Sequence, residues 1–401
     1  MTVIRTLLVT IAAALLGTLV ACAPAAVPPT PTVVAPKPVA TSAPSPPSSP
    51  TPVAAKPAAT AAPPSAPTTA PSALAQVIEG AKKEGQVTVS LTGNFTKKGL
   101  DRLRDELKQT YGFDLRLEFE PATSYAGMTA KIIAEHKAGA KSTYDLIQSS
   151  DVSVSQAVDA GAVLKVDWKP LLAQGTAPET VQWDGHALQI YSGHVGLVFN
   201  PRVIPPSEAP KSFVDLSNPK WQGKMTMNNS TSNILKRAIV LGVDRSLSDL
   251  RAVIKNQPVL DTYAAMTTRY LSGEYPLGVL IGSPYYENIR RQNYPVEWRS
   301  LDISDLASHV MLVLKNSAHP NSAMLVALFI ASPQGRKLVQ EEANGGSIFY
   351  SGNYEYEIHQ QDVKAGMKVF SVQDWPGAKD FLQSDKGKEV DKEIGEIMKG
   401  R

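Results

Sequence analysis

Short polar segments follow several of the strands that the sequence predicts. Two of these segments come directly after predicted strands: Thr92, Gly93 and Asn94; and Ser149, Ser150 and Asp151. In open α/β sheets, ligands bind beyond the carboxyl ends of the strands. These residues are therefore candidate ligand-binding residues. The alternative for Ser149, Ser150 and Asp151 is plain helix capping. Tyr285 and Tyr286 are adjacent near the carboxyl end of a third predicted strand, where the alternative to ligand binding by both is one ring in the core and one lining a cleft for another solute.

A further polar cluster, Ser230, Thr231, Ser232 and Asn233, directly precedes a predicted helix that begins near Ile234. The start of a helix presents free backbone N–H groups and the positive end of the helix dipole, which together favour an anion. Serine and asparagine also cap helices without binding any ligand. The cluster therefore predicts a capped helix start, with an anion or ligand site as the open possibility.

Several kinds of chemistry lack a sequence signal. The only cysteine is Cys22, which excludes an intramolecular disulfide and a multi-cysteine metal site. The histidines have neither i, i+4 pairing nor metal-ligand spacing, and we expect them to have structural or surface roles: His136, His186, His194, His309, His319 and His359. There is neither a Gly-rich phosphate loop nor a nucleophile elbow. A net charge of +3 without a basic run indicates no nucleic-acid partner.

Helices and strands alternate at short intervals in the first half of the ordered region. Gly85 and Gly112 end two of the predicted helices, and leucines recur on one face of the second helix. The expected elements are a helix over Ala73–Glu84, a strand over Val87–Leu91, a helix over Lys97–Thr110, a strand over Leu115–Phe119, a helix over Thr123–Lys137, a strand over Tyr144–Gln148 and a helix over Ser153–Ala160. This alternation predicts a parallel α/β sheet.

A second α/β unit follows a polar, proline-rich stretch around residues 201–210. A predicted strand over Val195–Phe199 precedes this stretch, and the unit itself comprises a strand over Met225–Met227, the helix from Ile234, a strand over Leu277–Ile281 and a helix through Arg291. A further strand over His309–Leu314 and the apolar helix Asn321–Ala331 follow it. The segment from Gln360 to the C-terminus is predicted to be helical, with a solvated charged face.

The N-terminus has the features of a targeting segment. Arg5 precedes an apolar run over Leu7–Val20, which has the length of a signal-peptide core and is short for a membrane-spanning helix. The run ends in Leu19, Val20, Ala21 and Cys22, which resembles the bacterial lipobox, whose cysteine is acylated. We therefore expect lipidation of Cys22 and anchoring to the cell membrane, against the alternative of an ordinary secretory signal.

Residues 23–72 contain 16 of the 31 prolines of the chain and not one aromatic residue. Such a composition cannot form a core, and proline at this density favours an extended conformation. At roughly 3.1 Å per residue, the segment predicts a semi-rigid tether of up to ~150 Å. Its expected role is to hold the globular part away from the membrane.

Several motifs of the globular part resemble the ferric-ion-binding branch of the ABC-transporter substrate-binding proteins, along most of residues 86–345. Ser192–Asn200 looks like the Ser-Gly-Arg stretch of that branch and the crossover strand after it, and Phe213–Lys224 is similar to its Pro-Lys-Trp-x-Gly-Lys signature. Leu277–Ile281 followed by the tyrosine pair, and Ser332–Arg336 before a helix, are also similar to segments of the branch.

The resemblance implies an α/β fold of the two-lobed type II periplasmic-binding-protein class, with two crossover strands and a ligand cleft between the lobes. It also implies transport without catalysis, no required cofactor, a monomeric protein and an ABC permease as the membrane partner. The expected boundaries are a signal peptide and lipobox over 1–22, a tether over 23–72, lobe 1 over 73–197, lobe 2 over 198–300, a return to lobe 1 over 301–345 and C-terminal helices on lobe 2 over 346–401.

The resemblance further implies that Tyr285 and Tyr286 donate two phenolate oxygens to Fe3+, with an anion beside the metal at Ser230–Asn233. A hard trivalent cation favours anionic oxygen and lowers the pKa of a phenol bound to it. The first-lobe positions that would add a histidine and a carboxylate fall near Phe95 or Thr96 and near Ser150, where neither is present. Asp151, Tyr125 and Tyr191 are possible substitutes.

Three classes of function remain open on the sequence. The first is an importer's binding protein, either for Fe3+ or for a small organic solute or oxyanion such as a phosphonate, a carboxylate or a polyamine. The second is a lipoprotein that presents its ligand to a membrane sensor. The third is a secreted hydrolase on the same scaffold, since a fold does not fix a function, but the sequence has no local signature of one.

Overall fold

Glycines with positive φ end the helices that open the globular region. The computed structural model describes residues 72–400 except 93, 94 and 123, and it leaves the side chains of Thr92, Pro121, Ala122 and Asp151 undescribed. Gly85 follows α1 with φ of 67°, and Gly112 follows α2 with φ of 75°. A residue without a side chain adopts this left-handed conformation at little cost, so each helix stops there and a strand follows.

The first lobe contains the elements that the alternating pattern predicts, with boundaries shifted by a few residues. They are α1 (Ala73–Glu84), β1 (Gln86–Thr92), α2 (Lys97–Tyr111), β2 (Arg116–Ala122), α3 (Tyr125–Lys137), β3 (Leu146–Ser150), α4 (Asp151–Asp159), β4 (Val181–Gln182), α9 (Pro320–Ala331) and α10 (Pro333–Ala343). Strands β2, β1 and β3 are parallel neighbours in that order.

The second lobe is another α/β unit, in which β8, β6 and β7 are parallel neighbours. Its elements are β6 (Met225–Asn228), α5 (Thr231–Leu241), α6 (Val243–Ile254), β7 (Val259–Asp261), α7 (Tyr263–Leu271), β8 (Leu277–Gly282), α8 (Ser283–Arg291) and β9 (Glu297–Arg299). The C-terminal elements are α11 (Tyr354–Lys364), β11 (Lys368–Phe370), α12 (Ala378–Gln383) and α13 (Asp385–Met398).

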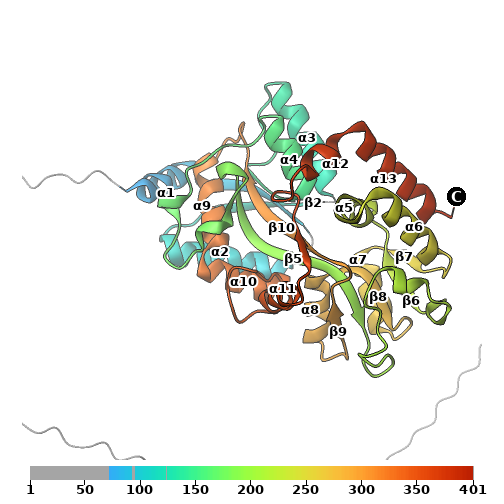
Figure 1. Ribbon diagram of the computed structural model, residues 1–401. Helices are drawn as coiled ribbons and strands as arrows, with labels where there is room; N and C mark the ends of the chain where they lie inside the picture. Colours follow the sequence, from blue (N-terminus) through green and yellow to red (C-terminus); the bar gives the residue numbers. More distant parts are fainter. Residues whose placement is uncertain (1–71, 93–94, 123, 401) are drawn as a thin grey trace, which may run out of the picture. The chain divides into compact units, whose positions relative to one another are not determined.

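Two long strands, β5 (Ala187–Phe199) and β10 (Ile303–Val313), join the lobes (Figure 1). The first half of β5 pairs antiparallel with β10, and its second half pairs with β8 and β9. β10 in turn pairs with β3 of the first lobe and with β11. The fold is therefore the two-lobed type II architecture with two crossover strands, as the sequence predicted.

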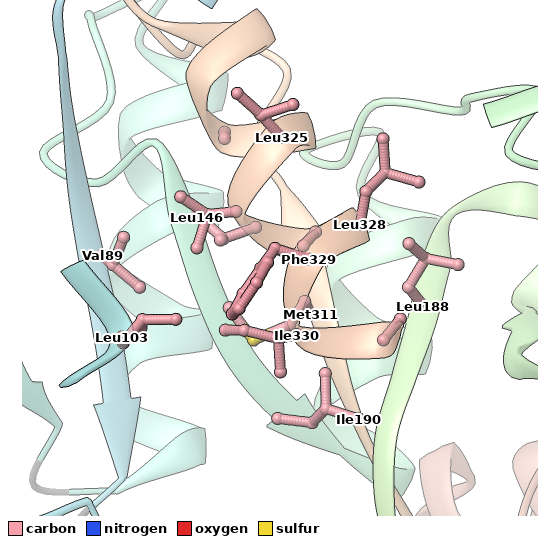
Figure 2. Packing of buried hydrophobic residues seen from close by; sticks show 14 of the residues in the cluster. Val89, Leu103, Leu146, Leu188, Ile190, Met311, Leu325, Leu328, Phe329 and Ile330 are labelled. Atoms are coloured by element: carbon pink, nitrogen blue, oxygen red, sulfur yellow. The ribbon is translucent and has the colours of Figure 1, made fainter. Parts of the chain in front are cut away.

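Separate hydrophobic cores stabilise the two lobes. In the first, α9 packs against the sheet, and Figure 2 shows Phe329 among Val89, Leu146, Leu188 and Met311. All five of these side chains are buried. The second core forms around β6 and β8, with contributions from α5, α6 and the C-terminal helix α13. The crossover strands connect two separately packed bodies, and the space between those bodies is where a ligand cleft is expected.

Two irregularities interrupt the pairing of β5. The register with β10 shifts between His309 and Val310, and the register with β8 shifts beside Gly196. Opposite the second shift lies Leu280, a buried residue with φ of 54°. A bulge of this kind bends the strand and redirects the residues that follow it. Here it lies just before Gly282, where β8 ends and α8 begins.

Candidate functional site: a polar cavity at the crossover strands

A cavity of about 1040 Å3 lies where the crossover strands meet both lobes. Tyr191, Gly193 and His194 of β5 and His309 of β10 form part of its wall. The rest of the lining comes mainly from the first turns of helices in the two lobes. Its members include Thr96, Ser124, Tyr125, Ser150, Ser230, Ser232, Asn233, Lys236, Tyr263, Thr267, Gly282, Tyr285, Asn288 and Glu342.

The N-cap residues of five helices line this cavity. They are Thr96 before α2, Ser124 before α3, Ser150 before α4, Ser230 before α5 and Gly282 before α8. Thr96 and Ser124 accept hydrogen bonds from their own helices, whereas Ser150 and Ser230 make no such cap bond and Gly282 has no side chain to make one. Backbone N–H groups in the first turn of a helix have no intrahelical partner, so these starts give the cavity a positive potential.

Asn228 at the end of β6 organises the start of α5. Its side-chain oxygen accepts hydrogen bonds from the backbone N–H of Ser230 at 3.1 Å and from the amide of Asn233 at 3.0 Å. The hydroxyls of Ser230 and Ser232 lie 2.9 Å apart. Ser230, Ser232 and Asn233 of the predicted cluster thus line the cavity together, whereas Thr231 is not part of its lining.

Two tyrosines, a histidine and a glutamine form a connected cluster at the crossover strands. The Gln148 amide donates to the Tyr125 hydroxyl at 2.8 Å and to the Tyr191 hydroxyl at 3.0 Å. A 3.0 Å hydrogen bond joins the Tyr125 hydroxyl to His309 Nδ1, and the His309 ring stacks on Tyr191 with 4.1 Å between centroids. Burial raises the pKa of Tyr191 well above its usual value, so this phenol is neutral at neutral pH.

The adjacent tyrosines of α8 lie in different surroundings. Tyr285 lines the cavity, and its ring centroid is 5.1 Å from that of Tyr263. Tyr286 is not part of the lining, and its ring packs 5.7 Å from Trp298 and 6.5 Å from Tyr354. The two residues lie within a helix, in which neighbours are about 100° apart, and not in an extended strand end. This arrangement matches the alternative of one ring packed among other side chains and one lining the cleft, and iron ligation by both tyrosines stays a prediction.

Of the remaining predicted residues, some line the cavity, and others are buried away from it or lie outside the described part of the chain. Ser150 lines the cavity, whereas Ser149 is fully buried and its hydroxyl has no hydrogen-bond partner among the described residues. Thr92 ends β1 and Asp151 begins α4, but their side chains lie outside the described part of the chain. Gly93 and Asn94 lie outside it altogether, as do Cys22, the predicted signal peptide and the tether.

The charged groups of the lining have partners of opposite charge. Lys236 Nζ lies 3.1 Å from Asp305, and Glu342 lies 3.2 Å from Lys98 and 3.3 Å from Arg102. Glu342 is the sole carboxylate among the described lining residues. Within the described residues, no group of three or more His, Cys, Asp or Glu side chains could hold a metal ion. The cavity is thus polar and aromatic, with few anionic oxygens.

Sequence reasoning missed part of this site. His309 was assigned a structural role, yet it faces the cavity, because antiparallel pairing places it opposite Tyr191. Tyr263 begins α7, which the sequence analysis did not delimit. The available signal for Tyr263 was the preceding Thr262, which caps α7 by accepting a hydrogen bond from Ala265 N–H. No local pattern marks His309.

The family model for the bacterial extracellular solute-binding proteins matches residues 141–345, which is more than half of the chain. The chain belongs to this family. Its members bind solutes outside the cytoplasm, so the expectation of an extracytoplasmic binding protein and not an enzyme is confirmed. No curated protein matches the sequence. In the described part of this solute-binding protein, the helices are too short or too polar to cross a membrane.

Solved structures with the same fold are similar over most of their length. Iron-bound HitA from Pseudomonas aeruginosa has 16% identity and a TM-score of 0.60, covering 77% of this chain and 99% of its own. A putative spermidine/putrescine ABC transporter protein from Listeria monocytogenes has 12% identity and a TM-score of 0.60, covering 79% and 100%. The protein AgtB from A. tumefaciens R10, in complex with agropinic acid, has 14% identity and a TM-score of 0.58, covering 79% and 99%. These likenesses confirm the two-lobed fold.

Proposed function

We propose that this protein is the solute-binding component of an ABC importer and that its cavity captures a small organic anion, such as a carboxylate or a phosphonate. The observation that carries the proposal is the group of helix starts around the cavity. Those of α4, α5 and α8 have no side-chain cap bond from the N-cap residue, so the N–H groups of their first turns are available to an anionic head group, except at Pro284 of α8, which has no N–H.

The body of such a ligand has suitable partners in the same cavity. Tyr263 and Tyr285 offer aromatic surface, and Asn233, Asn288 and Thr267 offer neutral hydrogen-bonding groups. A polyamine is disfavoured because the one described carboxylate of the lining, Glu342, already has two cationic partners. The cavity volume of about 1040 Å3 also accommodates an organic molecule and not only a single ion.

A ligand screen tests this proposal. The purified protein is heated with carboxylates, phosphonates, amino acids and polyamines in turn, because a ligand that binds only the folded state raises the melting temperature. We expect saturable stabilisation by one or more organic anions and none by polyamines. Stabilisation by polyamines alone would overturn the proposed charge of the ligand.

Ferric ion is the second candidate, supported by the phenols of Tyr125, Tyr191 and Tyr285 and by His309 at one cavity. Binding would require deprotonation of phenols whose pKa burial raises, which the ion's own charge would have to offset. Titration with ferric citrate tests it through the visible charge-transfer band of an iron phenolate. A band that Tyr285→Phe removes and Tyr286→Phe leaves unchanged would favour iron over the organic anion.

Lipid anchoring at Cys22 completes the proposed function. An acylated cysteine followed by a proline-rich tether would hold a monomeric binding protein near a membrane permease. The test is membrane fractionation with mass spectrometry of the mature N-terminus, comparing the natural chain with Cys22→Ala. We expect the natural chain in the membrane fraction with a lipid-modified cysteine. Release of the natural chain into the soluble fraction without a modified cysteine would contradict anchoring.

A further inference from the structure

A second, much smaller cavity lies beside helix α10, and none of its lining residues belongs to the main cavity. Its volume is about 150 Å3, and its polar lining includes Arg336, Lys337, Gln340, Ser347 and Ser351. Arg336 and Gln340 are four residues apart on the same helix and therefore lie on one face of it. The cavity thus brings two cationic side chains and several neutral hydrogen-bond donors together.

Arg336 has unusual surroundings for a half-buried cation. Its guanidinium lies over the ring of Tyr350, and its Nε is buried without a hydrogen-bond partner among the described residues. Within the described part of the chain, Arg336 takes part in no salt bridge. By contrast, the buried Arg237 pairs with Asp302. Burial lowers the pKa of Arg336, but an arginine side chain stays protonated, so the positive charge remains without a carboxylate.

The lining carries no acidic side chain to neutralise that charge. Lys337 adds a second positive charge and lies 4.0 Å from Glu341, which is outside the lining. A buried or half-buried charge is costly unless a counter-charge or hydrogen bonds compensate it. The aromatic ring below the guanidinium supplies part of this compensation through its π face. The in-plane N–H groups of the guanidinium remain suited to an oxyanion, which they bind through two parallel hydrogen bonds, that is, in bidentate geometry.

The size of the cavity restricts what could fill it. At about 30 Å3 per water molecule, 150 Å3 corresponds to the space of roughly five waters. This space suits an anion with three or four oxygens. Two glycines, Gly345 and Gly346, line the cavity, and a side chain on Gly345 would approach Tyr191 of the main cavity to 3.0 Å. The small cavity therefore lies directly behind the crossover strand.

We propose that Arg336 is the centre of a second ligand site, which binds a small oxyanion such as phosphate, sulfate or a short carboxylate. Arg336 would take the anion in bidentate geometry, with Lys337 adding charge and the hydroxyls of Ser347 and Ser351 adding hydrogen bonds. The site is separate from the proposed cleft ligand, and its test does not depend on that proposal.

The test is titration of the purified protein with inorganic phosphate and with sulfate at constant ionic strength, followed by calorimetry and by the melting temperature. We expect saturable binding of one anion, weakened at least about tenfold in Arg336→Gln, because the positive charge and the bidentate hydrogen-bond donors are lost. Arg336→Lys should weaken binding less, since the charge remains and only the bidentate geometry is lost. Ser232→Asp, in the main cavity, should leave binding at Arg336 unchanged.

A second variant keeps the test decisive if Arg336→Gln folds poorly. Ser351→Asp places a carboxylate in the same small cavity, so we expect a higher melting temperature without phosphate and no further rise with it. The proposal is overturned if Arg336→Gln and Ser351→Asp bind phosphate as tightly as the natural chain does. It is also overturned if anion binding is lost in Ser232→Asp alone, which would place the anion in the main cavity.

Discussion

Replacing Glu355 by glutamine perturbs a buried network that links three elements around the cavity. Glu355 of α11 lies 2.5 Å from His194 Nδ1 of β5, and its other oxygen accepts a 2.5 Å hydrogen bond from the Ser283 hydroxyl of α8. The backbone N–H of His194 donates to the same hydroxyl at 2.9 Å. The side chains of His194 and Glu355 are both fully buried. One carboxylate of α11 therefore connects the crossover strand β5 to the start of α8 in the second lobe.

The expected loss of stability follows from this burial. Removing one partner of a buried ion pair costs about 3–5 kcal/mol, because the other partner is left without compensation. Glutamine can still accept a hydrogen bond, so we expect about 3 kcal/mol for Glu355→Gln and about 5 kcal/mol for Glu355→Ala. At about 2 °C per kcal/mol for a chain of this size, Glu355→Gln should lower the melting temperature by roughly 6 °C.

The same network sets a pH dependence. Burial opposes the charged imidazole of His194, but attraction to Glu355 raises the pKa of His194 above its usual value, with smaller contributions from Asp362 and Asp305. Burial lowers the pKa of the nearby His359. A group whose pKa is higher in the folded state stabilises the protein fully below its unfolded pKa of about 6.5. That contribution is lost as the pH rises through the raised value. Glu355→Gln should abolish this loss.

The assay is urea unfolding at pH 5.5, 6.5 and 8 for the natural chain, for Glu355→Gln and for the matched control Glu393→Gln. Glu393 pairs with Arg251 at 2.5 Å, but both side chains are about half exposed, so its replacement should cost less than about 1 kcal/mol. If Glu355→Gln unfolds at the same urea concentration as the control, or keeps the pH slope of the natural chain, the reasoning about the buried network is refuted.

Further predictions concern the walls of the main cavity. Tyr285→Ala should weaken ligand binding at least about tenfold, whereas Tyr286→Phe should leave the affinity unchanged, both measured by calorimetry. Equal effects of the two variants would contradict the assigned orientations. Gly345→Ala should cost about 1–3 kcal/mol in urea unfolding, because the added carbon would approach Val339 Cγ1 to 2.5 Å and Tyr191 Cβ to 3.0 Å. An unchanged unfolding midpoint would contradict that close approach.

The sequence predicted most of the first lobe because its signals are local. Gly85 and Gly112 mark helix ends, and short apolar strands alternate with helices. The first half of β5 was missed, since Gln189, Ser192 and His194 interrupt its apolar pattern. Those polar residues are buried at the crossover, where their partners come from distant segments such as β10 and α11. A local pattern carries no information about such partners.

The site residues at strand ends and helix starts could be predicted from the sequence, whereas those that depend on the pairing of distant strands could not. The rule that ligands bind beyond strand ends located Ser150, and the argument from the helix start located Ser230; both residues line the cavity. The family resemblance located Tyr285, which lines the cavity too. It failed to separate Tyr285 from Tyr286, because the strand ends at Gly282 and a helix has begun by that point. The contribution of His309 follows from its register opposite Tyr191, which only the folded sheet specifies.

The charge of the captured ligand is the central claim, and Ser232 offers the most direct measurement of it. Ser232 is an exposed residue in the first turn of α5, where aspartate is well tolerated by the helix and would add a negative charge to the cavity. The affinity of the most stabilising carboxylate or phosphonate is measured by calorimetry for the natural chain, for Ser232→Asp and for the uncharged Ser232→Asn. We expect Ser232→Asn to bind within about threefold of the natural chain and Ser232→Asp at least about tenfold more weakly. Equal affinity of the two variants, or tighter binding by Ser232→Asp, would contradict the account of an anion-binding cavity.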